Sequence, residues 1–498
     1  MGSEPEPFAQ GSPSLITDVS GATWAPLFQK RCSFDPGDFS KAMDNLIRNP
    51  NINSSWLFRA DILLEKDCTQ DLPQDITPDA TGPSPIIVQF ADFHLDKVLI
   101  RRLVPRNPLR DPPLDQTCLI YRGCEVDEAG TASSMVVYKP HVSSPSDVPF
   151  YHPRVKALAF LHQWDANTGE GTVSIHYQFF EDYGSNEKLV RTGLHLLSTL
   201  HKHGEGNKRG YVKRVQHDTV IPQATVQSTY ARLKKKYARR LIEEWVEVTD
   251  PTKHCFEDLG IAAFLIELWA QMYRDTQFPG FVDIGCGNGL LVYILRQEGY
   301  SGWGFDARRR KSWDKFTDRI DPTSEKDTGL SLRQLVLLPT VLQQPQQQAI
   351  DDGELAEKIH DGVFPEGTFI ISNHADELTP WTPILATLSN CPFIMIPCCS
   401  HDLSGARFRA AAPKEKGKSA SAYSSLVEWV KQIAHDCGWV VEIEMLRIPS
   451  TRNTGIIGRS RVEEPASPDI PDLLSKYGGT GGYVDNAVKL MKTAPRGH

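Results

Sequence analysis

A glycine-rich turn between an apolar segment and a helical segment constrains this chain more than any other feature. Residues 281–284 are a short apolar run, and the heptapeptide DIGCGNG at 283–289 follows a D-x-G-x-G-x-G pattern. Residues 290–298 then have the periodicity of a helix. This order of strand, tight turn and helix predicts a backbone that approaches a ligand closely, with N–H groups free at the helix N-terminus.

Two carboxylates distinguish two classes of cofactor. Asp306 ends the next apolar run, 23 residues after Asp283, where a carboxylate can accept hydrogen bonds from two ribose hydroxyls. Dinucleotide sites prefer G-x-G-x-x-G, without an acidic residue two positions before the first glycine. Asp283 therefore favours S-adenosylmethionine, whose ammonium group it can bind, although a plain turn is the simpler alternative. The expected cofactor-binding residues are Asp283, Gly285, Cys286, Gly287, Asn288, Gly289 and Asp306.

The segments after this motif alternate between strand-like and helix-like patterns. Apolar runs are found at 302–306, 368–372, 393–398, 440–448 and 455–458, and a helical pattern is found at 421–437. Such alternation predicts an α/β fold with a mostly parallel sheet that is covered by helices.

Composition predicts how the 498 residues divide, because a chain of this length exceeds what one core usually supports. We expect a poorly ordered arm at 1–84, ending in a Pro- and Asp-rich linker at 69–85, because these residues mix Pro, Ser, Gly and Asp with isolated aromatics. Strand-length apolar pieces predict a β-rich domain at 85–205, which we expect to be of the α+β class. The other expected parts are a basic linker with an amphipathic helix at 206–256, the α/β domain at 257–460 and a tail at 461–498.

A polar block, SNHADELTPW at 372–381, directly follows the expected fourth strand. Side chains at that edge of the sheet face the transferred group, so Asn373, Asp376 and Glu377 are the candidates to orient or deprotonate an acceptor. Alternatively, Asp376 and Glu377 are charges at a helix N-terminus that the helix dipole favours. Both roles can hold at once.

Basic charge is concentrated in one segment, although the formal net charge of the chain is −8. Residues 207–240 contain ten Lys or Arg and a single acidic residue, Asp218. A solvated helical face would show the same pattern, but the adjoining basic loop favours contacts with nucleic-acid phosphates. The expected RNA-binding residues are Lys234, Lys235, Lys236, Arg239 and Arg240.

The ten cysteines have no regular spacing, which predicts free thiols and a reducing, cytoplasmic location. Cys391, Cys398, Cys399 and His401 lie close together, but zinc sites usually have two matching Cys pairs. We therefore expect core cysteines and no metal. Apolar runs stay well below the roughly 20 residues that cross a bilayer, so we expect no membrane partner. No obligate protein partner is indicated.

Several blocks together resemble the tRNA (uracil-2′-O-)-methyltransferase family, which modifies serine tRNA. They are FVDIGCGNGLLVYIL, GWGFDARRRKSW, ISNHADELTPWTPILA, CPFIMIPCCSHDLSG and IPSTRNTGIIGR, with RRLVPRNPLRDPPLDQTCLIY and VPFYHPRVKALAF upstream. The resemblance implies a class I (Rossmann-like) methyltransferase fold with a seven-stranded sheet, S-adenosylmethionine as donor, and the 2′-hydroxyl of a tRNA uridine as acceptor.

Two alternatives to this function remain open. One is a catalytically silent, methyltransferase-like RNA-binding protein. The other is an RNA base methyltransferase, because the position of Asn373 resembles a polar motif that grips an exocyclic amine.

Overall fold

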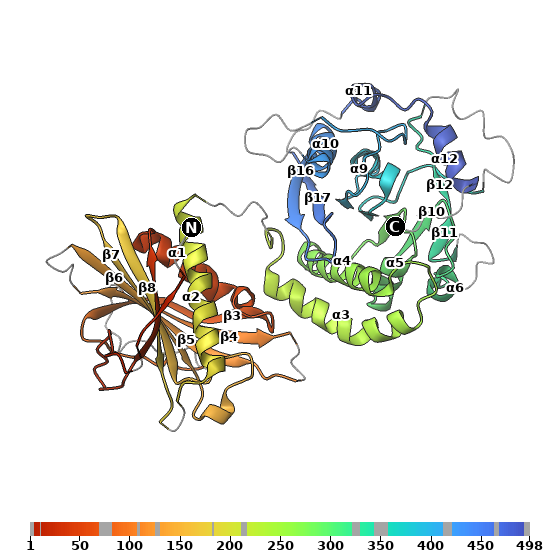
Figure 1. Ribbon diagram of the computed structural model, residues 1–498. Coiled ribbons are helices and arrows are strands. Elements are labelled where there is room, and N and C mark those ends of the chain that lie inside the picture. The colour runs from red at the N-terminus through yellow and green to blue at the C-terminus, as the bar shows by residue number, and fades with distance from the viewer. Residues whose placement is uncertain are drawn as a thin grey trace. The chain divides into compact units, whose positions relative to one another are not determined.

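The computed structural model describes residues 4–9, 11–68, 82–106, 110–124, 130–181, 184–210, 217–320, 329–342, 357–411, 421–462 and 468–492. The chain forms two compact units, Met1–Lys213 and Arg214–His498 (Figure 1). Among the described residues, the structure contains no helix whose length and apolar character would suit a membrane span.

The first unit is built on an eight-stranded antiparallel sheet with the order β1-β2-β8-β7-β6-β5-β4-β3. The strands are β1 (Glu6–Pro7), β2 (Ala25–Cys32), β3 (Leu57–Asp67), β4 (Phe93–Pro105), β5 (Leu114–Gly123), β6 (Thr131–Pro140), β7 (Ala157–Asp165) and β8 (Glu170–Gln178). The helices are α1 (Pro36–Arg48) and α2 (Glu187–Lys208), with short 3-10 turns η1 (Pro50–Ile52) and η3 (Pro145–Asp147).

Alternate strand residues point to opposite faces of this sheet, and each face is buried in an apolar cluster. On one face Val136 belongs to an apolar cluster with Met43 of α1 and Leu197 of α2. On the other face Val137 belongs to a cluster with Trp24, which lies just before β2. The β-rich domain with additional helices is therefore confirmed, but it begins well before residue 85.

The expectation of a poorly ordered arm at 1–84 is wrong for residues 25–67, which form β2, α1 and β3. Pro and Asp, which suggested an irregular segment, start the helix instead: the Asp35 side chain accepts a hydrogen bond from Asp38 N, and Pro36 occupies the first turn. The expected linker at 69–85 lies mostly outside the described residues. The expected start of a basic linker at residue 206 is also wrong, because α2 continues to Lys208.

The second unit contains a seven-stranded sheet with the order β11-β10-β9-β14-β15-β17-β16. All neighbouring pairs up to β15 are parallel, and β17 runs antiparallel to both β15 and β16. The strands are β9 (Phe281–Ile284), β10 (Gly302–Asp306), β11 (Leu332–Gln334), β14 (Phe369–Asn373), β15 (Phe393–Ile396), β16 (Trp439–Met445) and β17 (Thr454–Arg461). A separate ribbon pairs β12 (Val336–Leu337) with β13 (Ile359–His360).

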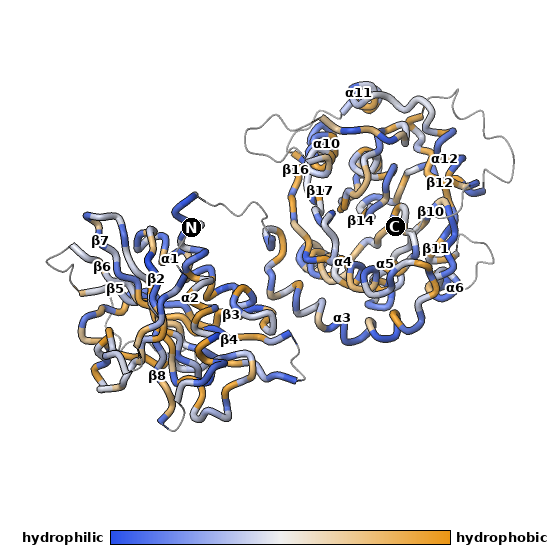
Figure 2. The backbone as a smooth tube through the Cα atoms, viewed as in Figure 1, coloured by the Kyte–Doolittle hydropathy of each residue, from blue (hydrophilic) through white to orange (hydrophobic). Residues whose placement is uncertain are grey.

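Helices cover both faces of this sheet, as the sequence predicted. Ile371 of β14 belongs to a cluster with residues of α3 (Gln223–Glu243), α4 (Pro251–Met272), α5 (Leu290–Gln297) and α6 (Trp313–Phe316). The adjacent Ile370 belongs to the cluster of α9 (Thr382–Leu388), α10 (Ala422–Asp436), α11 (Ile470–Lys476) and α12 (Tyr483–Lys492). Figure 2 shows hydrophobic stretches on α4 and α5 and an alternation of hydrophobic and hydrophilic residues along α3.

Two expected boundaries in this half differ from the structure. The helix in the segment 206–256 is part of the α/β unit, because Leu233, Tyr237 and Leu241 of α3 are buried in its core. The segment 461–498 is more than a tail, since α11 and α12 pack against the sheet. Their apolar residues, such as Leu473 and Val484, belong to the same buried cluster as the sheet residues Val282 and Ile370.

Candidate active site

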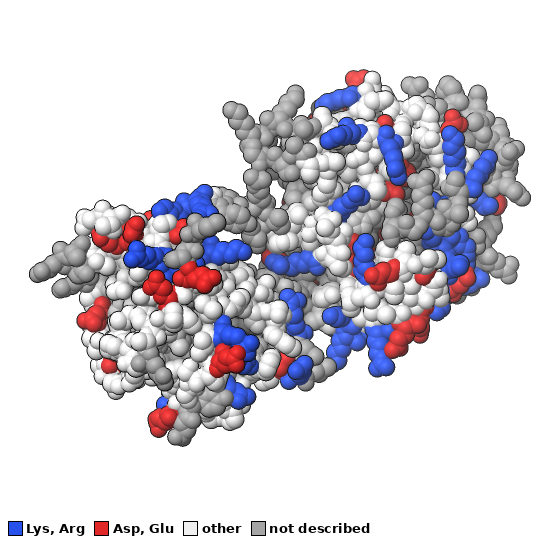
Figure 3. Space-filling model, in the orientation of Figure 1, with Lys and Arg blue, Asp and Glu red and all other residues white. Residues whose placement is uncertain are grey.

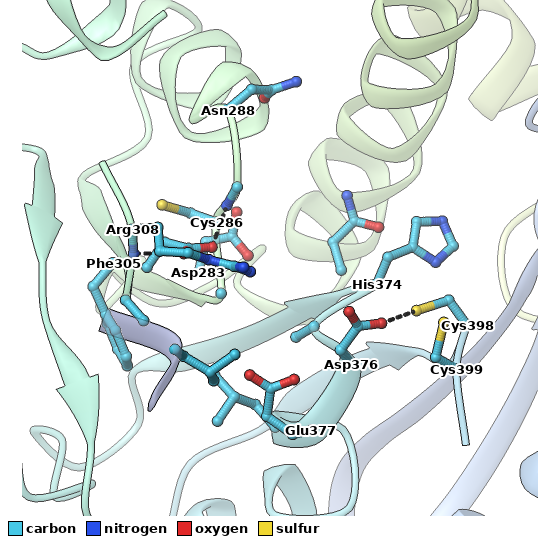
Figure 4. A pocket seen from close by; sticks show the side chains of 18 of the residues that line it. Asp283, Cys286, Asn288, Phe305, Arg308, His374, Asp376, Glu377, Cys398 and Cys399 are labelled. Carbon is cyan, nitrogen blue, oxygen red and sulfur yellow. Dashed lines mark hydrogen bonds between the residues drawn. The ribbon is translucent and has the colours of Figure 1, made fainter. Parts of the chain in front are cut away.

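A cavity of ≈ 1010 Å³ opens at the carboxyl edge of β9, β10, β11, β14 and β15. Ligands of open α/β sheets bind at this edge. The cavity is lined by the glycine-rich loop, by the polar block after β14 and by residues of α4 and α12. Figure 4 shows its side chains: Asp283, Cys286, Phe305 and Arg308 on one side, and His374, Asp376 and Cys398 on the other.

Three glycines with positive φ shape the loop after β9. Gly285 (φ +73°) lies so close to the polar block that an added Cβ would be 3.0 Å from Ala375 Cβ. At Gly289 (φ +76°) an added Cβ would be 2.4 Å from Leu332 Cδ1. An added Cβ at Gly287 (φ +53°) would meet nothing within 4 Å, so the backbone there is open for a close approach by a ligand.

Side chains from the following segment hold this loop in place. Trp313 Nε1 donates to the Gly287 carbonyl at 2.9 Å, and Ser312 Oγ donates to the Asn288 carbonyl at 2.7 Å. The Cys286 amide donates to the Phe305 carbonyl at 2.9 Å, which fixes the loop to β10. Asn288 Oδ1 accepts from the Leu290 amide at 2.9 Å and so stabilises the start of α5.

The two expected cofactor carboxylates both reach the cavity. Asp283 is only 1% exposed, and its Oδ1 is a buried oxygen without a hydrogen-bond partner among the described residues. Burial, together with the nearby Asp258 and Asp306, raises the pKa of Asp283 well above its usual value. Such an orphaned carboxylate fits a cationic ligand group.

The carboxylate of Asp306, at the end of β10, already accepts hydrogen bonds from two backbone amides. Its Oδ2 accepts from the Gly287 amide at 3.2 Å, and its Oδ1 accepts from the Arg308 amide at 2.9 Å. Burial raises the pKa of Asp306 although these bonds oppose the shift. Each carboxylate oxygen has further lone pairs, so ribose hydroxyls can still bind there.

The backbone of the polar block has an unusual conformation just after β14. His374 (φ +51°) and Asp376 (φ +44°) both lie in the left-handed region, which side-chain-bearing residues rarely adopt and which costs about 1–3 kcal/mol each. Asp376 and Glu377 then begin the short 3-10 turn η6 (Asp376–Leu378). The two acidic residues therefore have both expected features, a turn N-terminus and a place on the cavity wall.

The three expected catalytic side chains have different surroundings. Asn373 Nδ2 donates to Asp258 Oδ1 at 3.4 Å, and Asp376 Oδ1 accepts from Cys398 Sγ at 3.0 Å (Figure 4). Burial, Asp376 and Asp306 together raise the pKa of Glu377 to about 7. Burial and the neighbouring Glu257 raise the pKa of Asp258 to about 8. At neutral pH the carboxyl groups of Asp258 and Glu377 are therefore protonated to a greater extent than exposed carboxyl groups are.

Sequence reasoning missed a pair that joins the polar block to α4. His374 Nε2 lies 3.1 Å from Glu257 Oε1, and Glu257 is only 6% exposed. Burial alone would raise the pKa of Glu257, but the hydrogen bond and positive charge of His374, with His254 and Lys253, lower it. The ring atom His374 Nδ1 is buried and has no hydrogen-bond partner in the described part of the chain. Both residues line the cavity.

Comparisons with known proteins fit this geometry. Residues 5–214 match the family model "TRM44-like, N-terminal bet v1-like domain", and residues 220–326 match "Predicted AdoMet-dependent methyltransferase". A "tRNA (uracil-O(2)-)-methyltransferase" from Neurospora crassa is 57% identical over 94% of this chain and 93% of its own. Relatives of the same name from Candida glabrata (37%; 97% of both chains) and Schizosaccharomyces pombe (36%; 99% and 98%) also match.

The chain belongs to the tRNA (uracil-O(2)-)-methyltransferase family. It is an enzyme of the methyltransferase class, and its methyl donor is S-adenosylmethionine. The resemblance in the sequence blocks is thereby confirmed.

The cysteines of this methyltransferase do not all lie where the sequence predicted. Cys391 is buried, as expected, and its Sγ donates to Pro365 O at 3.3 Å. Cys398 and Cys399 are only partly buried and line the cavity beside Asp376, with ligand atoms within 4.8 Å of one another. The expectation that they are core residues is wrong, because β15 ends at Ile396. The absence of a metal stays a prediction.

The expected RNA-binding residues on α3 are all exposed, but most of them have partners within the methyltransferase. Lys236 pairs with Glu298 at 2.8 Å, Arg239 with Glu243 at 2.9 Å, and Arg240 donates to Tyr293 Oη at 2.7 Å. Lys234 Nζ lies 4.8 Å from the centroid of the Phe256 ring. Lys235 has no ion pair with any residue that the structure describes. Figure 3 shows Lys and Arg side chains with acidic ones among them along the α3 edge of this unit.

Further residues that line the methyltransferase cavity were not among the expected site residues. The cavity wall carries several cations, which are Lys253, Arg308, Arg310, Arg407, Arg452 and Lys489. The helix α12 closes one side, where Tyr483 Oη donates to Leu337 O at 3.1 Å and Asn486 Nδ2 donates to Ser404 O at 2.9 Å. Only the tertiary structure brings these residues to the glycine loop.

Proposed function

We propose that this protein transfers the methyl group of S-adenosylmethionine to the 2′-hydroxyl of a uridine in tRNA, and that serine tRNA is its substrate. The names of the relatives support tRNA and uracil-O(2) as substrate and position. The observation that carries the proposal is a single cavity with an orphaned carboxylate, Asp283, on one wall and the His374–Glu257 pair on another.

The donor fits the first wall of the cavity. S-adenosylmethionine supplies an electrophilic methyl group on a sulfonium centre. We assign Asp283 to its ammonium group, the open backbone at Gly287 to its carboxylate and Asp306 to its ribose hydroxyls. Leu335, Val336 and Leu337, which follow β11 and line the cavity, give the adenine base an apolar contact.

The acceptor hydroxyl needs alignment and a place for its proton. As its oxygen bonds to the methyl carbon, the bond between carbon and sulfur breaks and the hydroxyl proton leaves. We assign this proton to His374 Nδ1, because Nε2 is engaged by Glu257, whose carboxylate orients the ring and stabilises its protonated form. Asn373, Asp376 and Glu377, on the same wall, orient the acceptor nucleotide.

We further propose that exposed cations hold the tRNA backbone and that the protein acts in the cytoplasm. The exposed cations of the cavity wall, Lys253, Arg407, Arg452 and Lys489, and the basic face of α3 supply phosphate contacts. All ten cysteines are free, which suits a reducing compartment.

Nucleoside mass spectrometry tests the reaction. Unmodified serine tRNA, incubated with the protein and S-adenosylmethionine, should yield a methylated uridine whose added mass stays with the ribose when the glycosidic bond is cleaved. Added mass on the base would show a base methyltransferase instead. A second tRNA of unrelated sequence should remain unmodified if serine tRNA is the substrate.

Calorimetry separates the enzyme from a silent RNA-binding protein. The wild-type protein should bind S-adenosylmethionine, and Asp306→Ala should weaken this binding by about 1–3 kcal/mol through loss of charge-assisted hydrogen bonds. No detectable donor binding by the wild-type protein would support the silent alternative.

A further inference from the structure

The first unit exposes a pair of aromatic side chains that pack against each other. Trp56 is 43% exposed and Phe150 is 54% exposed, and among the described residues no other Trp or Phe is comparably exposed. Their ring centroids are 5.4 Å apart and the planes are nearly perpendicular. Exposed apolar side chains that form a contiguous patch often mark a binding site.

Each of these rings has its own cation. Arg110 Cζ lies 5.3 Å from the centroid of the Trp56 ring, and Lys188 Nζ lies 3.9 Å from the centroid of the Phe150 ring. Both cations are exposed. Arg110 precedes β5 and Lys188 lies in the first turn of α2, so segments far apart in sequence converge on this cluster.

The backbone that carries the two rings is held by local hydrogen bonds. Trp56 O accepts from the Arg106 amide at 2.9 Å, and Ser55 O accepts from Arg106 Nε at 2.8 Å. Beside Phe150, Tyr151 Oη donates to Pro112 O at 2.7 Å. Hydrogen bonds therefore fix the backbone around the aromatic pair, and the entropic cost of ordering it on binding is small.

No ion pair joins Arg110 or Lys188 to a carboxylate among the described residues, although the exposed Glu187 directly precedes Lys188. Asp111 is buried, and Asp147 accepts hydrogen bonds from the Ser144 amide and hydroxyl, both at 2.9 Å. The cluster thus combines flat apolar surfaces with positive charge, which is the combination that binds single-stranded nucleic acid: bases stack on the rings and phosphates contact the cations.

We propose that Trp56, Phe150, Arg110 and Lys188 form a second RNA-binding site, which takes unpaired nucleotides of the substrate. The identity of the RNA rests on the proposed function, but the site lies in the first unit and is separate from the methyl-transfer cavity. Exposed Trp and Arg also occur at the centres of protein interfaces. RNA is favoured because each ring is paired with a cation that forms no ion pair with any described residue.

Equilibrium binding of serine tRNA and of a uridine-rich single-stranded RNA to the full-length protein tests this site. Base stacking on an aromatic side chain contributes about 1–3 kcal/mol per base, so Trp56→Ala or Phe150→Ala should weaken binding of both RNAs about 5-fold to 150-fold. Trp56→Phe keeps a stacking surface and should stay close to wild type. Arg110→Gln with Lys188→Gln should weaken binding and flatten its dependence on salt.

Matched substitutions in the same unit serve as controls. Leu63→Ala removes an exposed apolar side chain from β3, and Lys202→Ala removes an exposed cation from the far part of α2. Neither should change RNA affinity, and no variant should change donor affinity.

Three results would overturn the proposal. One is unchanged RNA affinity in the Trp56→Ala, Phe150→Ala double variant, and another is an equal loss in Leu63→Ala. The third is a slower reaction with unchanged RNA affinity, which would identify the cluster as a protein contact. If wild-type protein binds the RNAs but transfers no methyl group, the proposed function fails while this site stands.

Discussion

His374 Nε2 and Glu257 Oε1 lie 3.1 Å apart although 117 residues separate them in the chain. The contact joins the end of β14 to the second turn of α4, directly on the wall of the cavity. One ring nitrogen is thereby fixed and the other is left for the acceptor, which is the arrangement of a histidine base that a carboxylate orients.

We expect His374→Ala to lower the single-turnover rate of methyl transfer by about 10²-fold to 10⁴-fold, the usual contribution of a general base. Glu257→Gln should lower it less, because the ring remains but loses its charged partner. The rate constant is measured with saturating donor and tRNA, beside the affinity for each and the melting temperature.

Glu267→Gln is the control, since Glu267 lies on the same helix and bonds Thr229 on α3 instead. It should react at the wild-type rate. If His374→Ala also does so, with both ligands saturating, His374 has no role in proton transfer.

Donor affinity should rise with pH in the range of pH 6 to 7. Burial and the neighbouring Asp258 and Asp306 raise the pKa of Asp283, which favours the protonated form of its carboxyl before the donor binds. An ammonium ligand favours the ionised form, and binding therefore releases a proton that is more readily lost at higher pH. The increase is limited to about tenfold per pH unit, while the donor's own amino group, with a pKa of about 7.7–8.0, stays charged.

Calorimetry in two buffers of different ionisation enthalpy counts the released proton. Asp283→Asn should bind the donor more weakly and release no proton. An equal heat of binding in both buffers for the wild-type protein would contradict the assignment of Asp283 to the ammonium group.

The second half of the fold could be predicted well because its strands are apolar, are bounded by turns and alternate with helices. The expected run at 302–306 coincides with β10, and the helix at 421–437 differs from α10 by one residue at each end. β11 was missed, because Leu332–Gln334 has three residues and no repeating pattern. Its place in the sheet depends on its parallel pairing with β10.

The candidate site could be predicted only where its residues are close in sequence. DIGCGNG and the polar block each form a local motif, and both line the cavity. The sequence places the start of the α/β domain at residue 257, whereas α4 begins at Pro251 and brings Glu257 next to His374. Contacts such as this one, or those of α12 at the cavity, arise from packing between distant segments and leave no mark in local periodicity.

Reversing the charges of Lys234, Lys235 and Lys236 together should weaken tRNA binding and flatten its salt dependence, with donor affinity unchanged. Each phosphate contact that is lost reduces the slope of log affinity against log salt by about 0.7–0.9. Because Lys236 pairs with Glu298, part of the triple effect would come from repulsion there. Lys235→Glu alone avoids this pair and should flatten the slope by itself.

Arg239→Glu serves as a comparison, since Arg239 pairs with Glu243 on the solvent side of the same helix. Melting temperatures show whether α3 remains packed in each variant. An unchanged salt slope in the triple variant would mean that this basic face is only solvated.

At least one of Asp376 and Glu377 should be needed to orient the acceptor. Each carboxylate lines the cavity, and the left-handed backbone at Asp376 keeps this turn in a defined position. A displacement of the acceptor by about 1 Å can slow a reaction by about 10²-fold, so we expect a loss of this size in Asp376→Asn or Glu377→Gln. The measurement is single-turnover transfer with saturating donor and tRNA.

The pH dependence of the single-turnover rate distinguishes the role of Glu377 from that of Asp376. The pKa of Glu377 is raised to about 7, so at pH 6 the wild-type side chain is mostly protonated and its amide analogue resembles it. Glu377→Gln should therefore differ little from wild type at pH 6 and more at pH 8.5, where the carboxyl has lost its proton. Asp376→Asn, in contrast, should show its loss at both pH values, because it disturbs the hydrogen bond from Cys398. Near-native rates in both variants across this range would make the turn structural and leave His374 as the residue that handles the proton.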